Sequence, residues 1–133
     1  MTALADLSEG LEFTPLERTP DAIDLFLYSA SVWLPHRIHY DVPHTTGTEG
    51  HSALLVQGPL QGVFLLQLIA ANLGSAATVT SFVFRHQVPV YVDQTLVCKG
   101  RVIAVDQADG SLTCELWTEL DDGRRATVAE AAV

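Results

Sequence analysis

The chain has 133 residues, of which 48% are hydrophobic and 17% are charged. This is the size of one ordinary domain, and the balance excludes an intrinsically disordered chain. We therefore expect a single domain over residues 1–133. Sixteen acidic residues against seven basic ones give a net charge of −9, which makes nucleic acids and anionic membranes poor partners.

Cysteine content and the N-terminus both favour a cytoplasmic protein. Cys98 and Cys114 are too few for a disulfide framework or for a zinc site built from cysteine. The first thirteen residues lack the basic start and apolar core of a secretory signal. No cofactor is expected from these features.

The first expected elements are a strand and a short helix. Residues 11–18 fit the strand. Thr19 is the candidate cap of the helix, because Pro20 and Asp21 follow it as at many helix starts. Apolar residues at spacings of three and four then predict one apolar helix face, formed by Ile23, Phe26, Leu27 and Ala30.

An irregular loop and a buried helix are expected next. Segment 33–49 carries two prolines, three histidines and four Thr or Gly residues, and loops of this length are usually functional. Residues 53–56 fit a short strand or an extended segment, after which Gly58-Pro59 opens a helix over 60–73 that Gly74 closes. This helix is apolar almost all round, yet shorter than the ~20 residues that span a bilayer, so we expect it inside the fold.

The rest of the chain is expected to form an antiparallel sheet. Asp109-Gly110 and Asp122-Gly123 are typical of hairpin turns. One buried helix followed by a meander predicts an α+β fold in which the sheet wraps around the helix. The β-like runs cover 77–91, 94–105, 112–120 and 125–133.

Three blocks of sequence, in order, carry a family resemblance. Tyr28–Asp41 reads YSASVWLPHRIHYD, Leu54–Gln61 reads LLVQGPLQ, and Phe82–Leu96 reads FVFRHQVPVYVDQTL. Together they resemble the MaoC-like hot-dog-fold enoyl-thioester hydratases and dehydratases, in particular the subgroup with an HRIHYD-type active-site loop. The resemblance implies a five- or six-stranded antiparallel sheet around one long central helix. It also implies a homodimer, or a heteromer with another hot-dog subunit, acting on an acyl thioester of coenzyme A or acyl carrier protein.

The reaction that this resemblance implies adds water to a 2-enoyl thioester or removes it from a 3-hydroxyacyl thioester. His39, in the family's catalytic position, can alternate between acid and base near neutral pH. Gly58 is the expected oxyanion donor, because a helix N-terminus favours negative charge and a glycine lets the thioester oxygen approach.

Two departures from the family pattern bear on the chemistry. Leu34 stands where many members have Asp or Asn to share the catalytic water, and Gln57 stands where a histidine is common. His36 or Asp41 could supply a second polar group, or a partner chain could. If the stretch is extended, Asp41 shares a face with His39 and could orient its imidazole.

The remaining expected substrate contacts are Gln57, His36 and Arg37, the last as either a phosphate contact or a loop salt bridge. Lys99 and Arg101 share a strand face and could form a basic patch for the phosphates of coenzyme A, which favours it over an acidic carrier protein.

The same residues allow four alternatives to a hydratase that works through His39. The loop histidines His36, His39, His44 and His51, with Asp41 and Glu49, are adequate metal ligands but follow no familiar spacing, so no metal site is predicted. The serines and cysteines follow no nucleophile pattern. A non-catalytic subunit that shapes a partner's acyl pocket is favoured by Leu34 and Gln57, and a thioesterase is disfavoured because residues 56–73 lack a carboxylate.

Overall fold

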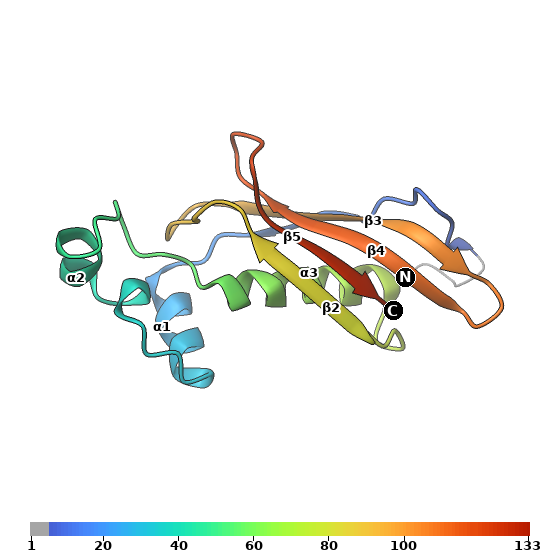
Figure 1. The fold of residues 1–133 in the computed structure, drawn as a ribbon, viewed down its shortest axis with the longest axis horizontal. Coiled ribbons are helices and arrows are strands. Elements are labelled where there is room, and N and C mark those ends of the chain that lie inside the picture. The colour runs from blue at the N-terminus through green and yellow to red at the C-terminus, as the bar shows by residue number, and fades with distance from the viewer. Residues whose placement is uncertain (1–5) are drawn as a thin grey trace.

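A computed structural model describes residues 6–133 and contains one five-stranded sheet (Figure 1). The strand order is β1-β3-β4-β5-β2, and all neighbouring strands are antiparallel. This confirms the α+β architecture. In chain order the elements are β1 (Leu16–Arg18), α1 (Ala22–Ser31), the 3₁₀ turn η2 (Arg37–His39), α2 (Val42–Gly47), α3 (Gly58–Leu73), β2 (Ser81–His86), β3 (Leu96–Asp106), β4 (Ser111–Glu119) and β5 (Arg125–Ala132).

Two hairpins form the centre of the sheet. β3 pairs with β4, and β4 pairs with β5, each with a small irregularity in register. Gly110 and Gly123 in the connecting turns have φ values of 74° and 83°, a backbone conformation that glycine adopts without strain. Both expected hairpin turns are therefore confirmed.

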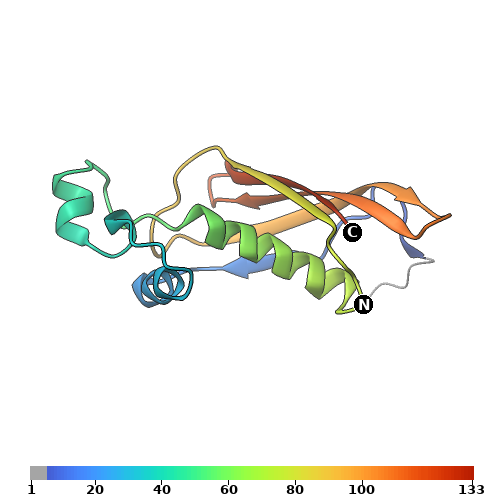
Figure 2. The same cartoon turned by 60° about the horizontal axis from the view of Figure 1, so that its bottom comes forward.

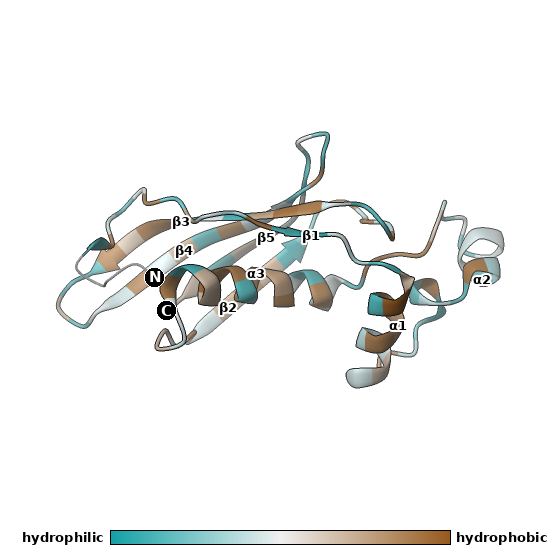
Figure 3. Cartoon of the chain, turned by 180° about the vertical axis from the view of Figure 1, so that it is seen from behind, coloured by the Kyte–Doolittle hydropathy of each residue, from teal (hydrophilic) through white to brown (hydrophobic). Residues whose placement is uncertain are grey.

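The long helix α3 lies along one face of the sheet (Figure 2). Apolar residues recur along its whole length (Figure 3), as expected from the sequence. Leu65, Leu68 and Ile69 are fully buried, and burying each such side chain contributes roughly 1.5–3 kcal/mol. Gly74, at φ 85°, follows the last turn. Among residues 6–133, no helix is long and apolar enough to cross a membrane.

The buried residues of the sheet complete one core with α3. Cys98 and Cys114 belong to it, and burial raises the pKa of these thiols to about 11 and about 12. Both thiols are therefore protonated at neutral pH and unsuited to nucleophilic attack.

The helices α1 and α2 lie with η2 beyond one end of the sheet, beside the start of α3 (Figure 1). The N-cap of α1 is Asp21 rather than the expected Thr19, because Asp21 and Asp24 form a reciprocal capping box. The expected apolar face of α1 is also wrong. Its buried residues are Leu25 and Ser29, whereas the predicted face is largely exposed, with exposed fractions of 68% for Ile23, 57% for Phe26 and 58% for Leu27.

Several expected boundaries differ from the structure. The segment 33–49 is not wholly irregular, since it contains η2 and α2. Residues 53–56 form no strand and make a single bridge, from Leu55 to Tyr91. The first strand is confined to residues 16–18, and the expected run 77–91 is a strand only over 81–86. In the three strand segments the sequence contains β-forming residues, but pairing with a neighbouring strand covers only part of each segment or a single bridge.

Candidate active site

A cavity of about 320 Å³ opens where the start of α3 meets η2 and the segment that follows β2. The backbone of Gly58 and the side chain of His39, both predicted site residues, line it together. Much of the remaining lining is apolar, which suits an acyl chain. Its polar side chains are His39, Gln61, His86 and Gln87.

His39 is buried, with only 7% of its surface exposed, and its ring has a fixed orientation. Nδ1 lies 2.8 Å from the carbonyl oxygen of Leu55. A carbonyl can only accept, so Nδ1 carries the hydrogen and Nε2 of the neutral ring keeps its lone pair. The backbone holds this arrangement in place, because the N–H of Leu55 donates to the carbonyl of Ile38, the residue before His39.

The pKa of His39 is lowered, chiefly because burial disfavours the charged ring. The hydrogen bond to Leu55 opposes this effect, and the charge of nearby His36 adds to it. His39 is therefore a neutral base at pH 7, with its free lone pair on Nε2.

His36 lies beside His39, with the two ring centroids 6.0 Å apart, but it does not line the cavity. Its Nδ1 accepts the backbone N–H of Ile38 at 3.4 Å, where η2 begins. The side chain of His36 therefore caps the 3₁₀ turn η2, and its contact with substrate stays a prediction.

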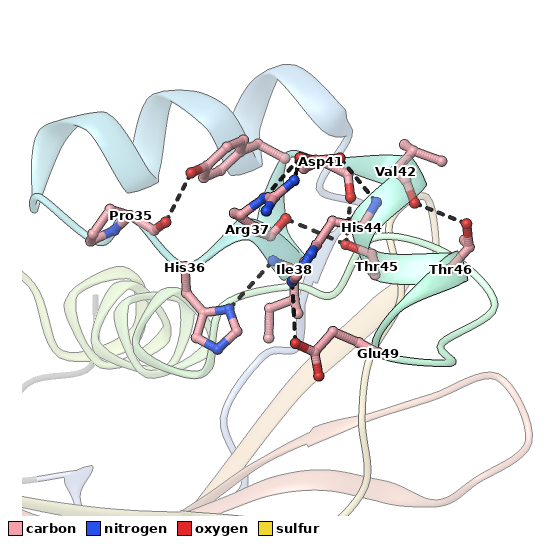
Figure 4. Close-up of polar contacts among 11 residues, drawn as sticks. Pro35, His36, Arg37, Ile38, Asp41, Val42, His44, Thr45, Thr46 and Glu49 are labelled. Atoms are coloured by element: carbon pink, nitrogen blue, oxygen red, sulfur yellow. Dashed lines mark hydrogen bonds and ion pairs between the residues drawn. The ribbon is translucent and has the colours of Figure 1, made fainter.

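Asp41 does not orient the His39 imidazole, contrary to expectation. Its carboxylate instead accepts the backbone N–H of His44 as the N-cap of α2, and pairs with Arg37 at 2.7 Å (Figure 4). These two contacts, the first being the larger cause, hold the pKa of Asp41 below its usual range. The stretch is not extended, because residues 37–39 form a 3₁₀ turn, and the condition for Asp41 and His39 to share a face is not met.

Gln57 is fully buried and does not line the cavity. Its Nε2 donates to the carbonyl of Leu25 at 2.6 Å and to the hydroxyl of Ser29 at 2.9 Å, both on α1. The geometry therefore gives Gln57 a structural connection between α1 and the start of α3, rather than the substrate contact expected from the sequence.

The start of α3 combines a glycine with an open helix end. Within the described residues no side chain caps this terminus, so its first N–H groups remain for water or a ligand. The space beside Gly58 is not empty, however. A Cβ placed on Gly58 would collide with Nε2 of His86, so the imidazole lies against the α-carbon of this glycine.

Sequence reasoning missed His86, although it lies within the third block of the family resemblance. Two signals could have found it. Phe82, Phe84 and His86 alternate along β2, which places them on one face of the strand. Gly58 and Gly62 are four residues apart, which places them on one face of α3. A row of large rings facing a row of glycines predicts close contact.

The basic patch expected from Lys99 and Arg101 is neutralised by neighbouring carboxylates. Lys99 pairs with Glu119 at 2.8 Å, and Arg101 pairs with Glu115 at 2.7 Å. Among residues 6–133, no three His, Cys, Asp or Glu side chains lie close enough together to hold a metal ion.

The fold is shared with solved structures of other proteins. R-hydratase PhaJ1 from Pseudomonas aeruginosa superposes with a TM-score of 0.90 at 18% identity, over 97% of this chain and 82% of that chain. A chain of the ChsH1-ChsH2 complex from Mycobacterium tuberculosis superposes with a TM-score of 0.84 at 19% identity, over 94% and 95%. This likeness confirms the expected hot-dog fold.

Sequence comparison gives the family. Mesaconyl-C(4)-CoA hydratase from Chloroflexus aurantiacus is 40% identical over 72 residues, which are 54% of this chain but only 25% of that protein. The chain thus spans about a quarter of the length of this curated relative. The family model described as hydroxyacyl-thioester dehydratase type 2 matches residues 8–92, a range that includes α1, η2, α3, β2 and both histidines of the cavity. The chain therefore belongs to the hydroxyacyl-thioester dehydratase type 2 family.

Proposed function

We propose that this chain interconverts 2-enoyl and 3-hydroxyacyl thioesters of coenzyme A by adding or removing water. One observation carries the proposal: a buried, neutral His39 and the open N-terminus of α3 line the same largely apolar cavity. Family membership and the hydratase activity named for the Chloroflexus relative support it.

Hydration needs three things that this cavity can supply. Nε2 of His39 removes a proton from water, and the water oxygen then bonds to the β-carbon of the enoyl group. The electrons of the double bond move towards the thioester, where negative charge develops on oxygen. The N–H groups at the start of α3 stabilise that charge, because they lie at the positive end of the helix dipole and have no partner within the helix. Protonation of the α-carbon completes the addition.

Coenzyme A is the proposed carrier because a chain of net charge −9 repels an acidic carrier protein. Arg37 is the proposed phosphate contact. It is exposed, and its ion pair with Asp41 is a surface interaction that a phosphate could compete with.

A second candidate function is that of a non-catalytic subunit in a heteromer. The position of Leu34 favours it, since this residue lines a separate apolar cavity with Phe26 and Trp33 and offers no polar group near His39. The ChsH1-ChsH2 structure shows that two chains named differently assemble in one complex of this fold.

Incubating the purified chain with a panel of 2-enoyl-CoA thioesters, followed by mass spectrometry, tests the proposal. We expect a gain of one water with the thioester intact. Release of free coenzyme A would identify a thioesterase instead. An unchanged panel, with activity restored only by co-expression with another hot-dog subunit whose own histidine is essential, would identify the non-catalytic subunit.

A further inference from the structure

His86 is a second imidazole in the cavity of His39, and it comes from a different element. It ends β2, where Phe82, Phe84 and His86 form a row with successive ring centroids 5.3 and 5.4 Å apart. This row lies against the glycines of α3. A Cβ on Gly62 would touch Phe84 at 3.4 Å, and one on Gly58 would collide with the His86 ring. The imidazole is therefore placed directly over the first turn of α3.

A hydrogen-bond network that starts at exposed His86 and ends among buried side chains fixes which nitrogen of His86 faces that turn. Nδ1 lies 2.8 Å from the hydroxyl of Thr127, which donates to Oε1 of Gln61 at 2.7 Å. Thr118 donates to the same oxygen at 3.3 Å. Since the single hydrogen of the Thr127 hydroxyl goes to Gln61, this hydroxyl accepts from Nδ1–H. Nε2, the atom nearest Gly58, then keeps a lone pair in the neutral ring.

His39 and His86 are thus oriented in the same way, although His39 is buried and His86 is exposed. Each has its Nδ1–H held by an acceptor, Leu55 in one case and Thr127 in the other, and each leaves Nε2 to gain or lose a proton. Loss of hydration lowers the pKa of both rings, so the pair that carries one proton is the minor form at pH 7 and becomes more populated as the pH falls. A fixed donor on one nitrogen and an exchangeable site on the other is the arrangement that general acid–base catalysis requires.

We propose that His86 is the second acid–base residue of this site, supplying the function for which Leu34 has no chemistry; this rests on the function proposed above. In hydration, Nε2 of neutral His39 takes a proton from water, and the water oxygen bonds to the β-carbon. The π-electron pair of the double bond moves to the α-carbon, which takes a proton from Nε2 of protonated His86. His39 ends protonated and His86 neutral. Proton exchange with solvent restores the starting pair, so the net change is one water added.

The pair predicts a distinctive pH profile. Within the described residues, His39 and His86 are the two titratable side chains that line the cavity. The elements packed against His86, α3 and β5, bring Gly58, Gln61 and Thr127, none of which titrates. The active form holds one proton on the pair, so kcat/KM is expected to be bell-shaped, with macroscopic pKa values that belong to the pair.

The test compares His86→Gln with His44→Gln, a matched change in α2 outside the cavity. For His86→Gln we expect kcat to fall by ~10²–10⁴-fold, the range for a general acid or base. The alkaline limb of the pH profile is expected to disappear, because the acid that this limb reports is gone. Binding of butyryl-CoA, which has no double bond to hydrate, is expected to change little. His44→Gln should leave all three unchanged.

Thr127 separates a positioning role from simple stability. Thr127→Val removes the acceptor of Nδ1–H at nearly constant volume, and we expect a lower kcat and an altered alkaline limb. Thr127→Ser keeps the hydroxyl and should restore both. If Thr127→Val lowers the melting temperature but leaves the pH profile as in wild type, the network is only structural and the inference is wrong.

The outcomes distinguish this inference from the proposed function. A wild-type chain that hydrates enoyl-CoA while His86→Gln keeps full kcat and both limbs overturns the role of His86 and leaves the proposed function standing. A wild-type chain that binds butyryl-CoA but hydrates nothing overturns both. Circular dichroism checks each fold, and His86→Asn replaces His86→Gln if the latter fails to fold.

Discussion

The chemistry proposed for His39 depends on which ring nitrogen carries hydrogen. The Leu55 carbonyl fixes that hydrogen on Nδ1, so removing the ring removes the base at Nε2. We expect His39→Ala to lower kcat by at least ~10²–10⁴-fold, with the fold retained. His44→Ala, on α2, should cost much less. Steady-state kinetics on an active 2-enoyl-CoA measure both, and near wild-type turnover in His39→Ala would end the assignment.

Burial of His39 also makes the stability of the chain depend on pH. Its pKa is lowered in the folded state, whereas in the unfolded chain it is ~6.5. As the pH falls below ~6.5 the unfolded state binds the proton first, so the free energy of unfolding decreases until the folded-state pKa is reached. The slope is at most about 1.4 kcal/mol per pH unit for this group.

Urea denaturation at several pH values between 7.5 and 5 measures this effect. His39→Gln should reduce the dependence to the part contributed by His86, because glutamine binds no proton in either state.

The carboxylate of Asp41 affects stability in a lower pH range. Its depressed pKa contributes stability that is lost only as the pH falls below ~4. A wild-type stability that is constant from pH 7.5 to 5 would contradict the lowered pKa of His39.

Residue types were predicted better than residue contacts. The sequence predicted His39 and Gly58 at the site through the family resemblance, and the cavity brings them together. It did not predict the partner of His39, because that partner is the backbone carbonyl of Leu55, sixteen residues away, and any residue could provide it. Proximity in sequence suggested Asp41 instead, and the 3₁₀ turn made that wrong.

At the scale of elements, periodicity predicted helices better than it predicted their buried faces. The spacing of apolar residues correctly indicated α1, but what a helix buries depends on the element opposite. Opposite α1 lies the start of α3, where the Gln57 side chain donates to Leu25 and Ser29, so α1 packs through these two residues. For the long helix α3 the buried face did not have to be predicted, because α3 carries apolar residues on nearly every face.

The contact between α3 and β2 predicts that the effects of substitutions at Gly58 and His86 on stability are coupled. Gly58→Ala places a Cβ where Nε2 of His86 lies, so we expect it to destabilise the fold as well as to impair turnover. In a His86→Ala background the ring is absent, and the same Gly58→Ala change should cost much less stability, because the added methyl group no longer meets an imidazole.

A double-mutant cycle by urea denaturation measures the coupling between these two positions. We expect a coupling free energy in the range of ~0.5–3 kcal/mol for residues in direct contact. Gly47→Ala is a suitable control, since a Cβ there meets nothing within 4 Å and the site is far from β2. Additive effects at Gly58 and His86 would show that the close approach is relieved in solution.

At the scale of the whole molecule, the free edge of β2 predicts an assembly. β2 pairs with β5 on one side and ends the sheet on the other, and Val83 in its middle is 67% exposed. Unpaired strand edges invite pairing with another chain. The exposed apolar residues of α1, together with Trp33 at 85% exposure, leave further apolar surface on the isolated chain. We therefore expect a dimer, as a homodimer or with a second hot-dog subunit.

Val83→Lys tests the β2 edge directly, because an edge lysine must lose hydration before another strand can pair there. Light scattering is expected to show a dimer for wild type and a shift towards monomer for Val83→Lys, with an unchanged circular dichroism spectrum. Val42→Lys on α2 is the matched control, since Val42 is 51% exposed but lies away from the sheet edge. A wild-type chain that is monomeric and fully active would contradict the assembly. A dimer that Val83→Lys leaves intact would move its interface away from β2, with the exposed face of α1 next to be tested.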